Sequence, residues 1–282
     1  NMHLKLVDYL SKNLNDKIIN YSSIHGGCIN ECFKLESKSR NYFVKINSSF
    51  NFFKEEVKGL DLLRKTGSFH IPKIINYGIS EGAAFLIMDF IKTNKPVNNF
   101  WHLFAKKLAK LHNVTNDNFG LEYNNYIGSL KQENTITNNA VDFFINCRLV
   151  PQLKQLNKNI SSSFYKKFDK LLYQLNNIIP KESPSLVHGD LWSGNYLVNN
   201  LGQPSLVDPA VYYGSREAEI AMTKLFGGFP NHFYELYNEE FQLQAGWESR
   251  IEIWNLYPLL VHANLFGESY LNQINFTLKK YN

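Results

Sequence analysis

The sequence lacks any apolar stretch near the roughly 20 residues that a membrane-spanning helix requires, so we expect no membrane partner. It also lacks a secretory signal at its start. Its three cysteines, Cys28, Cys32 and Cys147, do not have the spacing of a zinc site. Together these absences predict a protein of the reducing cytoplasm.

A long basic tract is also missing, although 30 Lys and Arg against 25 Asp and Glu give a net charge of +5. This charge suits a polyanionic small ligand as well as nucleic acid, and alone it does not decide between them. The lysines are scattered along the chain. With the motifs described below, we expect a small-molecule partner and no nucleic acid. Charged residues make up 20% and apolar residues 44%, which argues against disorder.

Helical spacing and alternating patterns divide the 282 residues into two parts of different character. Strand patterns around glycine turns dominate the chain to about residue 91. Two amphipathic helices are expected in the same part, at 4–14 and 51–67. From residue 100 onwards the patterns are mainly helical. We therefore expect an α+β fold of the two-lobed protein-kinase-like type, with a nucleotide-binding lobe over 2–91 and a catalytic and substrate lobe over 92–282.

The second part holds helices expected at about 100–114, 139–158 and 161–178, and everything after 215 is expected to be helical. Between them, the stretch "VHGDLWSGNYLV" (187–198) places a carboxylate, Asp190, in a glycine-rich turn. The stretch "SLVDPA" ends a short apolar run with a second carboxylate.

Three polar residues in this part of the sequence have a characteristic spacing: Asp190, Asn195 five residues later, and Asp208 thirteen residues after that. A tight hairpin between Asn195 and Asp208 brings its two ends together, and the loop holding Asp190 can face the same point. One amide oxygen and one carboxylate, completed by phosphate oxygens and water, suit Mg²⁺. A second carboxylate can accept a hydroxyl proton or orient the hydroxyl for attack.

This spacing is the layout of kinase phosphoryl transfer, with Asp190 as base and Asn195 and Asp208 as Mg²⁺ ligands. The alternative is that Asp190 and Asn195 only cap turns and Asp208 only caps a helix, which is the commoner role for any one of them. Three such residues joined by a hairpin of suitable length favour the catalytic interpretation. His188 is expected instead to pack against the hairpin and to hydrogen-bond backbone.

The first part contains the further elements that phosphoryl transfer needs. The turn "HGGCIN" has Gly26 and Gly27 between two strands, where backbone N–H groups can face phosphates, although a plain hairpin is the commoner reading. Lys45 lies within the strand "YFVKIN", and the following helix offers Glu55 or Glu56 as an ion-pair partner. The apolar strand "FLIMDFIK" runs out into a polar segment whose backbone can hold an adenine edge.

The chain resembles the fructosamine/ketosamine-3-kinase family, relatives of aminoglycoside and choline kinases. The resemblance covers nearly the whole chain. It rests on "HGGCINECFKL", "FVKIN", "HGDLWSGNYLV", "DPAVYYGSREAEIAMTKLFGGF" and "LVHANLFGESYL".

The resemblance implies ATP and Mg²⁺ as cofactors. It makes Asp190 the catalytic base, and Asn195 and Asp208 the metal ligands. It pairs Lys45, on the α- and β-phosphates, with Glu56. The remaining implied nucleotide contacts are Gly26, Gly27 and Cys28 in the phosphate loop, and Met88 with the backbone of Asp89 and Ile91 at adenine.

On the acceptor side the resemblance implies contacts from Trp192, Arg216 and Glu217. Trp192 can stack on an amino-sugar or on its cationic amine, or it can simply pack in the core. The chain departs from the family pattern at Ser215 and Glu219, where an acidic "GDREAD" segment is common. These departures bear on substrate preference.

Taken together, we expect an enzyme that transfers phosphate from ATP to a sugar hydroxyl, O3, of a ketosamine formed on an amine or lysine, a deglycation activity. Two alternatives stay open: an aminoglycoside- or choline-type kinase of the same fold, and a pseudokinase module that only holds nucleotide. The oligomeric state is also open between a monomer and a redox-sensitive dimer joined through Cys28.

Overall fold

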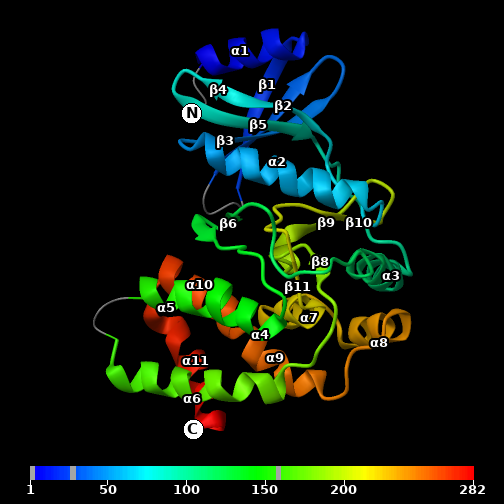
Figure 1. The fold of residues 1–282 in the computed structure, drawn as a ribbon. Helices are drawn as coiled ribbons and strands as arrows, with labels where there is room; N and C mark the ends of the chain where they lie inside the picture. Colours follow the sequence, from blue (N-terminus) through cyan, green and yellow to red (C-terminus); the bar gives the residue numbers. More distant parts are fainter. Residues whose placement is uncertain (1–3, 26–29, 157–159) are drawn as a thin grey trace. The chain divides into compact units, whose positions relative to one another are not determined.

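The computed structural model describes residues 4–25, 30–156 and 160–282. By their contacts the residues form two compact units, Asn1–Asn98 with Leu197–Val207, and Asn99–Tyr196 with Asp208–Asn282. The first unit is built on a sheet and the second mainly on helices (Figure 1). The structure is therefore of the predicted α+β class.

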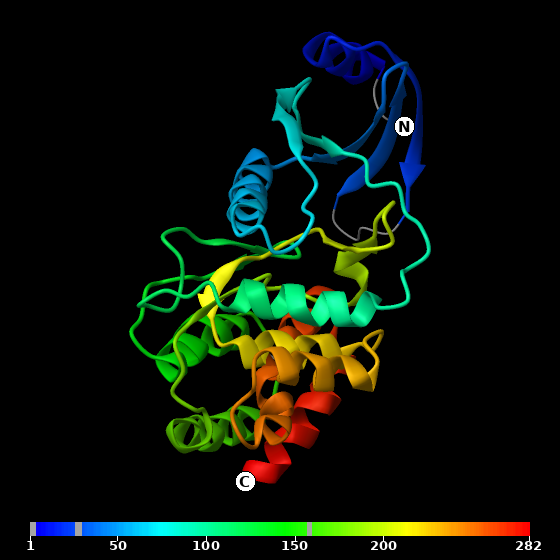
Figure 2. The same cartoon turned by 90° about the vertical axis from the view of Figure 1, so that its right-hand side faces the viewer.

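The first unit contains a five-stranded antiparallel sheet in the order β1-β2-β3-β5-β4. Its strands are β1 (Ile18–Ile24), β2 (Glu31–Ser37), β3 (Asn41–Asn47), β4 (Ile74–Ser80) and β5 (Ala83–Asp89). Two helices, α1 (Leu4–Leu14) and α2 (Phe50–Lys65), lie on opposite faces of this sheet (Figure 1 and Figure 2).

Alternation along the strands decides which helix each side chain meets, because successive residues of a strand point to opposite faces. The α1 face holds a buried apolar cluster formed by Leu6, Leu10, Phe33, Leu35, Tyr42, Val44, Phe85 and Ile87. Lys45 follows Val44 on β3 and so points to the other face, where α2 lies. The sheet thereby separates a fully apolar core from a face that carries a buried cation.

A hairpin of β9 (Tyr196–Val198) and β10 (Pro204–Leu206) joins the first unit through residues 197–207. The backbone of Asn94 donates to Val198 O at 3.2 Å, and that of Val97 donates to Gly202 O at 3.0 Å. Because the hairpin begins directly after Asn195 and ends two residues before Asp208, it returns the chain to the second unit at Asp208.

The helices of the second unit bury apolar residues at intervals of three and four, as their sequence patterns predict. In α6 (Ser162–Ile178) the buried residues are Phe164, Phe168, Leu171 and Leu175. The other main helices are α3 (Phe100–His112), α5 (Val150–Gln155), α7 (Arg216–Leu225), α8 (Asn231–Glu240), α9 (Trp247–Trp254), α10 (Leu256–Phe266) and α11 (Leu271–Leu278). Among them, α10 contacts both α5 and α11.

The expected helix at 139–158 is divided into three parts. It consists of α4 (Ala140–Phe143), a π-helical turn η1 (Phe144–Leu149) and α5. Single π-helical turns are rare and occur often near functional sites. Here the turn carries Arg148, which is buried. The second unit also holds two small strand pairs, β6 (Asn125–Ile127) with β7 (Leu130–Gln132), and β8 (Ser185–Val187) with β11 (Tyr212–Gly214).

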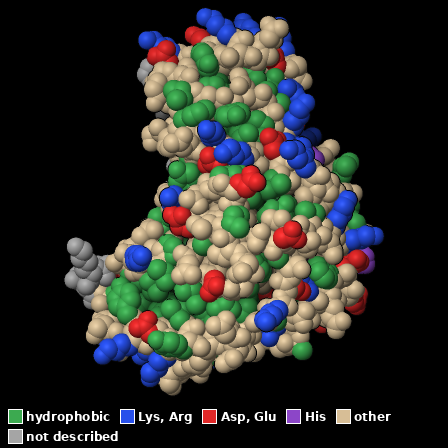
Figure 3. All heavy atoms as spheres, in the orientation of Figure 1, with side chains coloured by type: hydrophobic (Ala, Val, Ile, Leu, Met, Phe, Trp, Pro, Cys, Tyr) green, Lys and Arg blue, Asp and Glu red, His purple; other side chains and the backbone are tan. Residues whose placement is uncertain are grey.

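No helix among the described residues is long and apolar enough to cross a membrane. On the face drawn in Figure 3, acidic and basic side chains are interspersed over both units. Hydrophobic side chains gather on this face where Figure 1 shows α5 and α10.

Candidate active site

A glycine turn joins the buried strand β8 to the first candidate catalytic residue, Asp190. The intervening Gly189 has φ of +89°, which favours glycine. A Cβ atom at this position would lie only 1.8 Å from the carbonyl oxygen of Ala210. The loop can therefore approach the chain that follows Asp208 only because residue 189 has no side chain.

A carboxylate from α7 anchors the same turn. Glu219 accepts hydrogen bonds from the backbone N–H of His188 at 3.0 Å and of Gly189 at 2.8 Å. It also lies 2.8 Å from Nε2 of His112 on α3. Burial tends to raise the pKa of Glu219, but the hydrogen bond and charge of His112 outweigh it, so its pKa is lowered.

His188 serves the backbone, as the sequence predicts. Its side chain is fully buried, its Nδ1 accepts from Asp190 N at 3.2 Å, and its carbonyl accepts from Ala210 N at 2.9 Å. The backbone of His188 thus joins the Asp190 loop to the chain that follows Asp208, and its side chain holds the loop itself.

Asp190 and Asn195 are in direct contact. The side-chain amide of Asn195 donates to the Asp190 carbonyl at 2.8 Å and to Asp190 Oδ2 at 3.1 Å. Loss of hydration, with the nearby charge of Asp208, raises the pKa of Asp190 to about 7. The three residues that the sequence singles out therefore meet at one place in the second unit.

Asp208 has a left-handed backbone, with φ of +53°, which is uncommon for a residue other than glycine. The two residues that follow Pro209 are held by buried amides from the β6–β7 pair. Gln132 Nε2 donates to Ala210 O at 2.9 Å, and Asn125 Nδ2 donates to Val211 O at 2.8 Å. These bonds position the chain directly after Asp208.

The same amides belong to a larger buried network that ends at the π-helical turn. Asn134 donates to Asn125 Oδ1 at 2.9 Å, and Arg148 donates to Asn134 Oδ1 at 2.9 Å. Tyr257 donates to Gln132 Oε1 at 2.7 Å. The guanidinium of Arg148 also lies 4.0 Å from the ring centre of Tyr212. Sequence reasoning did not find this network.

The donor atoms present fit a magnesium ion better than a transition metal. The amide nitrogen of Asn195 is turned to Asp190, so its oxygen is left for another partner, and Asp208 adds a carboxylate. Hard oxygen ligands of this kind suit Mg²⁺, which usually keeps waters and substrate phosphates in its shell. In the described part of the chain, no three His, Cys, Asp or Glu side chains gather to hold a metal.

Trp192 lies at the surface of the catalytic loop and is 37% exposed. Its ring covers Gly194, where an added Cβ would lie 2.2 Å from Trp192 Cη2. The indole is thus not a core residue, and one part of it is open to solvent.

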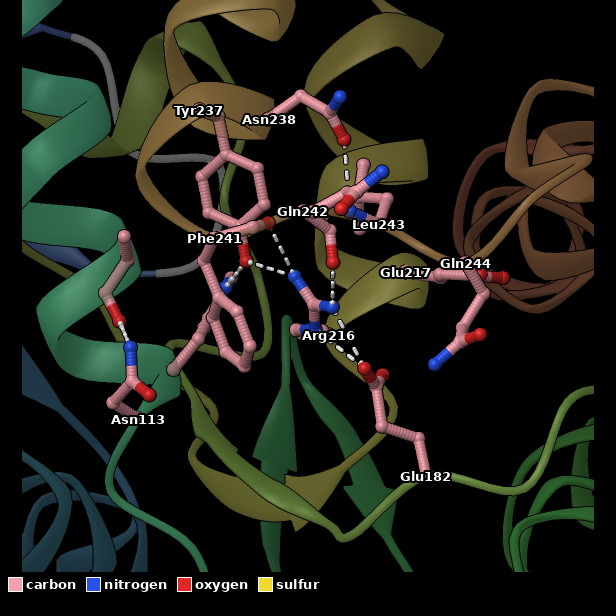
Figure 4. Close-up of polar contacts among 12 residues, drawn as sticks. Asn113, Glu182, Arg216, Glu217, Tyr237, Asn238, Phe241, Gln242, Leu243 and Gln244 are labelled. Carbon is pink, nitrogen blue, oxygen red and sulfur yellow. Dashed lines mark hydrogen bonds and ion pairs between the residues drawn. The ribbon is translucent and has the colours of Figure 1, made fainter.

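Arg216 and Glu217, the other expected acceptor contacts, are both buried in α7. Figure 4 shows the Arg216 guanidinium among Glu182, the Tyr237 hydroxyl and two backbone carbonyls, those of Phe241 and Gln242. The distance from Arg216 Nη2 to Glu182 Oε1 is 2.7 Å. Their contact with an acceptor stays a prediction.

Glu217 is turned away from Arg216 towards α9. Its Oε1 lies 2.6 Å from Arg250 Nη2, and its Oε2 accepts from Trp254 Nε1 at 3.1 Å. Arg216 and Glu217 of the "REAE" stretch therefore connect α7 to other parts of the chain.

In the first unit, Lys45 Nζ lies 2.6 Å from Glu56 Oε1, and both side chains are buried. Met88 is buried within β5. The N–H of Asp89 donates to Lys73 O at 2.9 Å. Within the described residues, Ile91 N–H makes no hydrogen bond and stays available to a ligand.

The expected phosphate loop, Gly26, Gly27 and Cys28, lies outside the described residues. Of the other two cysteines, Cys32 is half-buried and Cys147 is buried. A dimer through Cys28 stays a prediction.

A family model described as fructosamine kinase matches residues 2–282 of the chain. The chain belongs to the fructosamine kinase family. The predicted family, its kinase activity and its fold class are thereby confirmed.

Among similar proteins, one named as a probable ketoamine kinase from Enterococcus faecium is 36% identical over 274 residues, covering 95% of this chain and 96% of its own. A protein named protein-ribulosamine 3-kinase, chloroplastic, from Oryza sativa subsp. japonica is 36% identical over 264 residues, covering 90% of this chain and 76% of its own.

Among solved structures, a protein assigned as a fructosamine-3-kinase from Haemophilus somnus superposes with a TM-score of 0.87 at 28% identity, covering 98% of this chain and 96% of its own. A spectinomycin phosphotransferase in complex with ADP and spectinomycin gives a TM-score of 0.63 at 15% identity, covering 98% and 92%. The second likeness concerns the fold alone.

Sequence reasoning named Glu219 only as a departure in the acceptor region, whereas in the structure it anchors the turn before Asp190 through His188 N and Gly189 N. Its place at the start of α7 offers one signal, since a carboxylate in a first helical turn suits the free N–H groups nearby. Nothing in the local sequence points to His188 and Gly189 as its partners.

Proposed function

We propose that the chain transfers the γ-phosphoryl group of ATP to a sugar hydroxyl, O3, of a ketosamine formed on an amine or a lysine side chain. The names of relatives at 36% identity, ketoamine kinase and protein-ribulosamine 3-kinase, support this acceptor class. The fold shared with a phosphotransferase solved with ADP supports nucleotide use.

One observation carries the proposal: Asp190 and Asn195 are in contact at 3.1 Å beside Asp208 in a chain of this family. Asp190 accepts the proton of the attacking hydroxyl. The hydroxyl oxygen then bonds to the γ-phosphorus, the bond from that phosphorus to the bridging oxygen breaks, and ADP leaves with that electron pair.

Asn195 Oδ1 and the Asp208 carboxylate are the proposed ligands of Mg²⁺. When bound, this ion neutralises charge on the phosphate oxygens. The left-handed backbone of Asp208 orients this carboxylate. The side-chain amides of Gln132 and Asn125, which donate to the carbonyl oxygens of Ala210 and Val211, hold the chain that follows it. A preorganised ligand of this kind requires no rearrangement during the reaction.

In the first unit we assign Lys45 to the α- and β-phosphates. Glu56 holds its Nζ at 2.6 Å, with both side chains buried. Gly26, Gly27 and Cys28 are assigned to the phosphate loop. The free N–H of Ile91 is assigned to the adenine edge, with the carbonyl of Asp89 beside it and Met88 packing nearby.

The acceptor class is tested by following transfer of labelled γ-phosphate to a panel of fructose and ribulose adducts of lysine, aminoglycosides and choline. We expect label in the ketosamines, carried as a phosphate ester on the sugar oxygen O3 and not on the amine. We expect none in the aminoglycosides or in choline. Label only in an aminoglycoside or only in choline would show that the acceptor belongs to that class and is not a ketosamine. ATP binding without any transfer would instead indicate a non-catalytic module.

A further inference from the structure

A row of aromatic rings extends from the catalytic loop across the surface of the second unit. We call it the aromatic strip, and it consists of Trp192, Phe226, His262, Phe266 and Tyr270. The ring centres are 6.2 Å apart between Trp192 and Phe226, and 4.6 Å apart between Phe226 and His262. His262 is in turn 5.4 Å from Phe266 and 5.2 Å from Tyr270.

These rings are not a buried core. Trp192 is 37% exposed, Phe226 40% and Phe266 52%, and such large apolar side chains are unusual as neighbours at a surface. His262 and Phe266 are four residues apart on α10, so they share one side of that helix. The strip is therefore a continuous aromatic surface.

Two glycines hold the strip against the catalytic loop. Gly194 lets the indole of Trp192 lie over the backbone, since a Cβ there would be 2.2 Å from the ring. Gly228, two residues after Phe226, lets the chain approach Ser193, whose Cβ would lie 2.4 Å from an added Cβ. The strip therefore begins at Trp192, two residues after Asp190 along the chain.

In the part of the chain that the structure describes, the faces of these rings have no cation over them. Elsewhere the protein covers aromatic rings with its own cations, such as Lys224 at 4.0 Å from the ring centre of Tyr234. Within the described residues, no Lys or Arg covers a ring of the strip. Aromatic faces attract cations electrostatically, so the strip suits a positive charge brought by a ligand.

His262 adds a hydrogen-bond acceptor in the middle of the strip. Its Nδ1 lies 2.7 Å from the carbonyl oxygen of Pro258, which can only accept, so Nδ1 carries the proton. Burial lowers the pKa of His262, which keeps the ring neutral at pH 7. Nε2 therefore presents a lone pair, which suits the N–H of an ammonium group.

We propose that the aromatic strip binds the amine portion of the acceptor: a protonated alkylamine, with its hydrocarbon chain over Phe226 and Phe266 and its N–H directed to His262. The inference rests on the proposed function, because it takes the sugar hydroxyl to lie at Asp190. It narrows the acceptor to ketosamines of extended alkylamines, of which a lysine side chain is one.

The test uses calorimetric binding of two fructose derivatives in the presence of ADP, so that no turnover occurs. One is the adduct of Nα-acetyl-lysine. The other is an analogue of equal length in which an ether oxygen replaces the amine nitrogen, so that it lacks the positive charge. They are titrated into the wild type and into the variants Phe226→Ala and Phe266→Ala. The matched control is Phe276→Ala on α11, which is 60% exposed and lies outside the strip.

We expect Phe226→Ala and Phe266→Ala to weaken the lysine adduct by about twofold to about thirtyfold, the range of one cation–π contact. Binding of the ether analogue should weaken less than that of the lysine adduct, because it loses only the contact of its hydrocarbon chain, and binding of ADP should change less than about twofold. Phe276→Ala should bind like the wild type, and Phe226→Tyr should restore the affinity.

Equal binding of the lysine adduct by the wild type and both strip variants would overturn the inference, as would failure of the wild type to bind the adduct. A second outcome separates the two proposals. If the wild type binds the charged adduct more tightly than the ether analogue, both variants lose this difference, and no phosphorylation occurs once ATP replaces ADP, then the aromatic strip is supported and the proposed function is rejected. The two failures are thus distinguishable.

Discussion

The N–H of Gly189 donates to Oε1 of Glu219 at 2.8 Å, across 30 residues of sequence. The second oxygen of the same carboxylate accepts from His188 N and meets His112. One buried side chain thereby ties the residue before Asp190 to both α7 and α3. The position of Asp190 depends on this bond as much as on its own loop.

Acid should release this anchor. The pKa of Glu219 is lowered in the folded protein, so its charge stabilises the fold above the ordinary glutamate pKa of 4.5, and this contribution is lost as the pH falls through the folded value. Urea unfolding of the wild type and Glu219→Gln measures it. At pH 7 the variant should be less stable by about 1–3 kcal/mol, because a buried charged acceptor is lost.

Below pH 4.5 the free energies of unfolding of the two proteins should converge, since the wild type then loses the carboxylate charge that Glu219→Gln lacks at every pH. A difference that stays constant from pH 7 to pH 3 would show that Glu219 contributes no acid-sensitive stability.

Gly189 should tolerate no side chain. In Gly189→Ala the new methyl group would lie 1.8 Å from Ala210 O, which is itself held by Gln132. The control is Gly227→Ala, where φ is +74° but nothing lies within 4 Å. The control should lose only the left-handed penalty of about 1–2 kcal/mol. Gly189→Ala should lose several times that in thermal or urea unfolding, and equal losses would contradict the close approach.

Removing Gln132 should weaken metal binding as well as stability. Gln132→Ala leaves Ala210 O and the Tyr257 hydroxyl without their partner, at about 1–3 kcal/mol for each buried group. Because the chain beside Asp208 is then less well positioned, Mn²⁺ affinity in the presence of ADP should fall about tenfold. Electron paramagnetic resonance of free Mn²⁺ measures this directly.

The control for that experiment is Gln174→Ala, whose amide bonds the carbonyls of Lys170 and Tyr281 far along the chain from Asp208. It should keep the wild-type Mn²⁺ affinity. Unchanged affinity in Gln132→Ala would mean that the amides hold the fold and not the metal ligand.

The buried Glu217–Arg250 pair should matter far more for stability than an exposed pair. Arg250→Met leaves Glu217 buried without its cation, which costs about 3–5 kcal/mol. Lys280→Met removes the partner of Glu252 at the surface, where the two atoms also lie 2.6 Å apart, and should cost less than about 1 kcal/mol. Chemical denaturation of both variants compares them, and similar losses would refute a structural role for Glu217.

Much of this architecture is predictable from local patterns. The expected helix at 4–14 coincides with α1, and that at 161–178 differs from α6 by one residue. The hairpin between Asn195 and Asp208 follows from spacing and turn residues. Local patterns suffice here because helix faces and tight turns involve residues that are close in sequence.

The parts that sequence reasoning missed depend on contacts between distant residues. Gln132 meets Ala210 across 78 residues, and the π-helical turn at Phe144–Leu149 interrupts a pattern that reads as one helix. Arg216 and Glu217 carry charges that suggest a substrate, yet each has an ion-pair partner from another part of the chain, Glu182 for Arg216 and Arg250 for Glu217. Only the folded chain provides those partners.

Single-turnover transfer of phosphate from ATP to a fructose–lysine adduct measures whether Asp190 takes part in phosphoryl transfer. Asp190→Asn is compared with Asp169→Asn, a change at an exposed carboxylate on α6. We predict that Asp190→Asn binds ATP with wild-type affinity but transfers phosphate about a hundredfold to ten-thousandfold more slowly, while Asp169→Asn is unchanged. Transfer by Asp190→Asn at the wild-type rate would contradict the account.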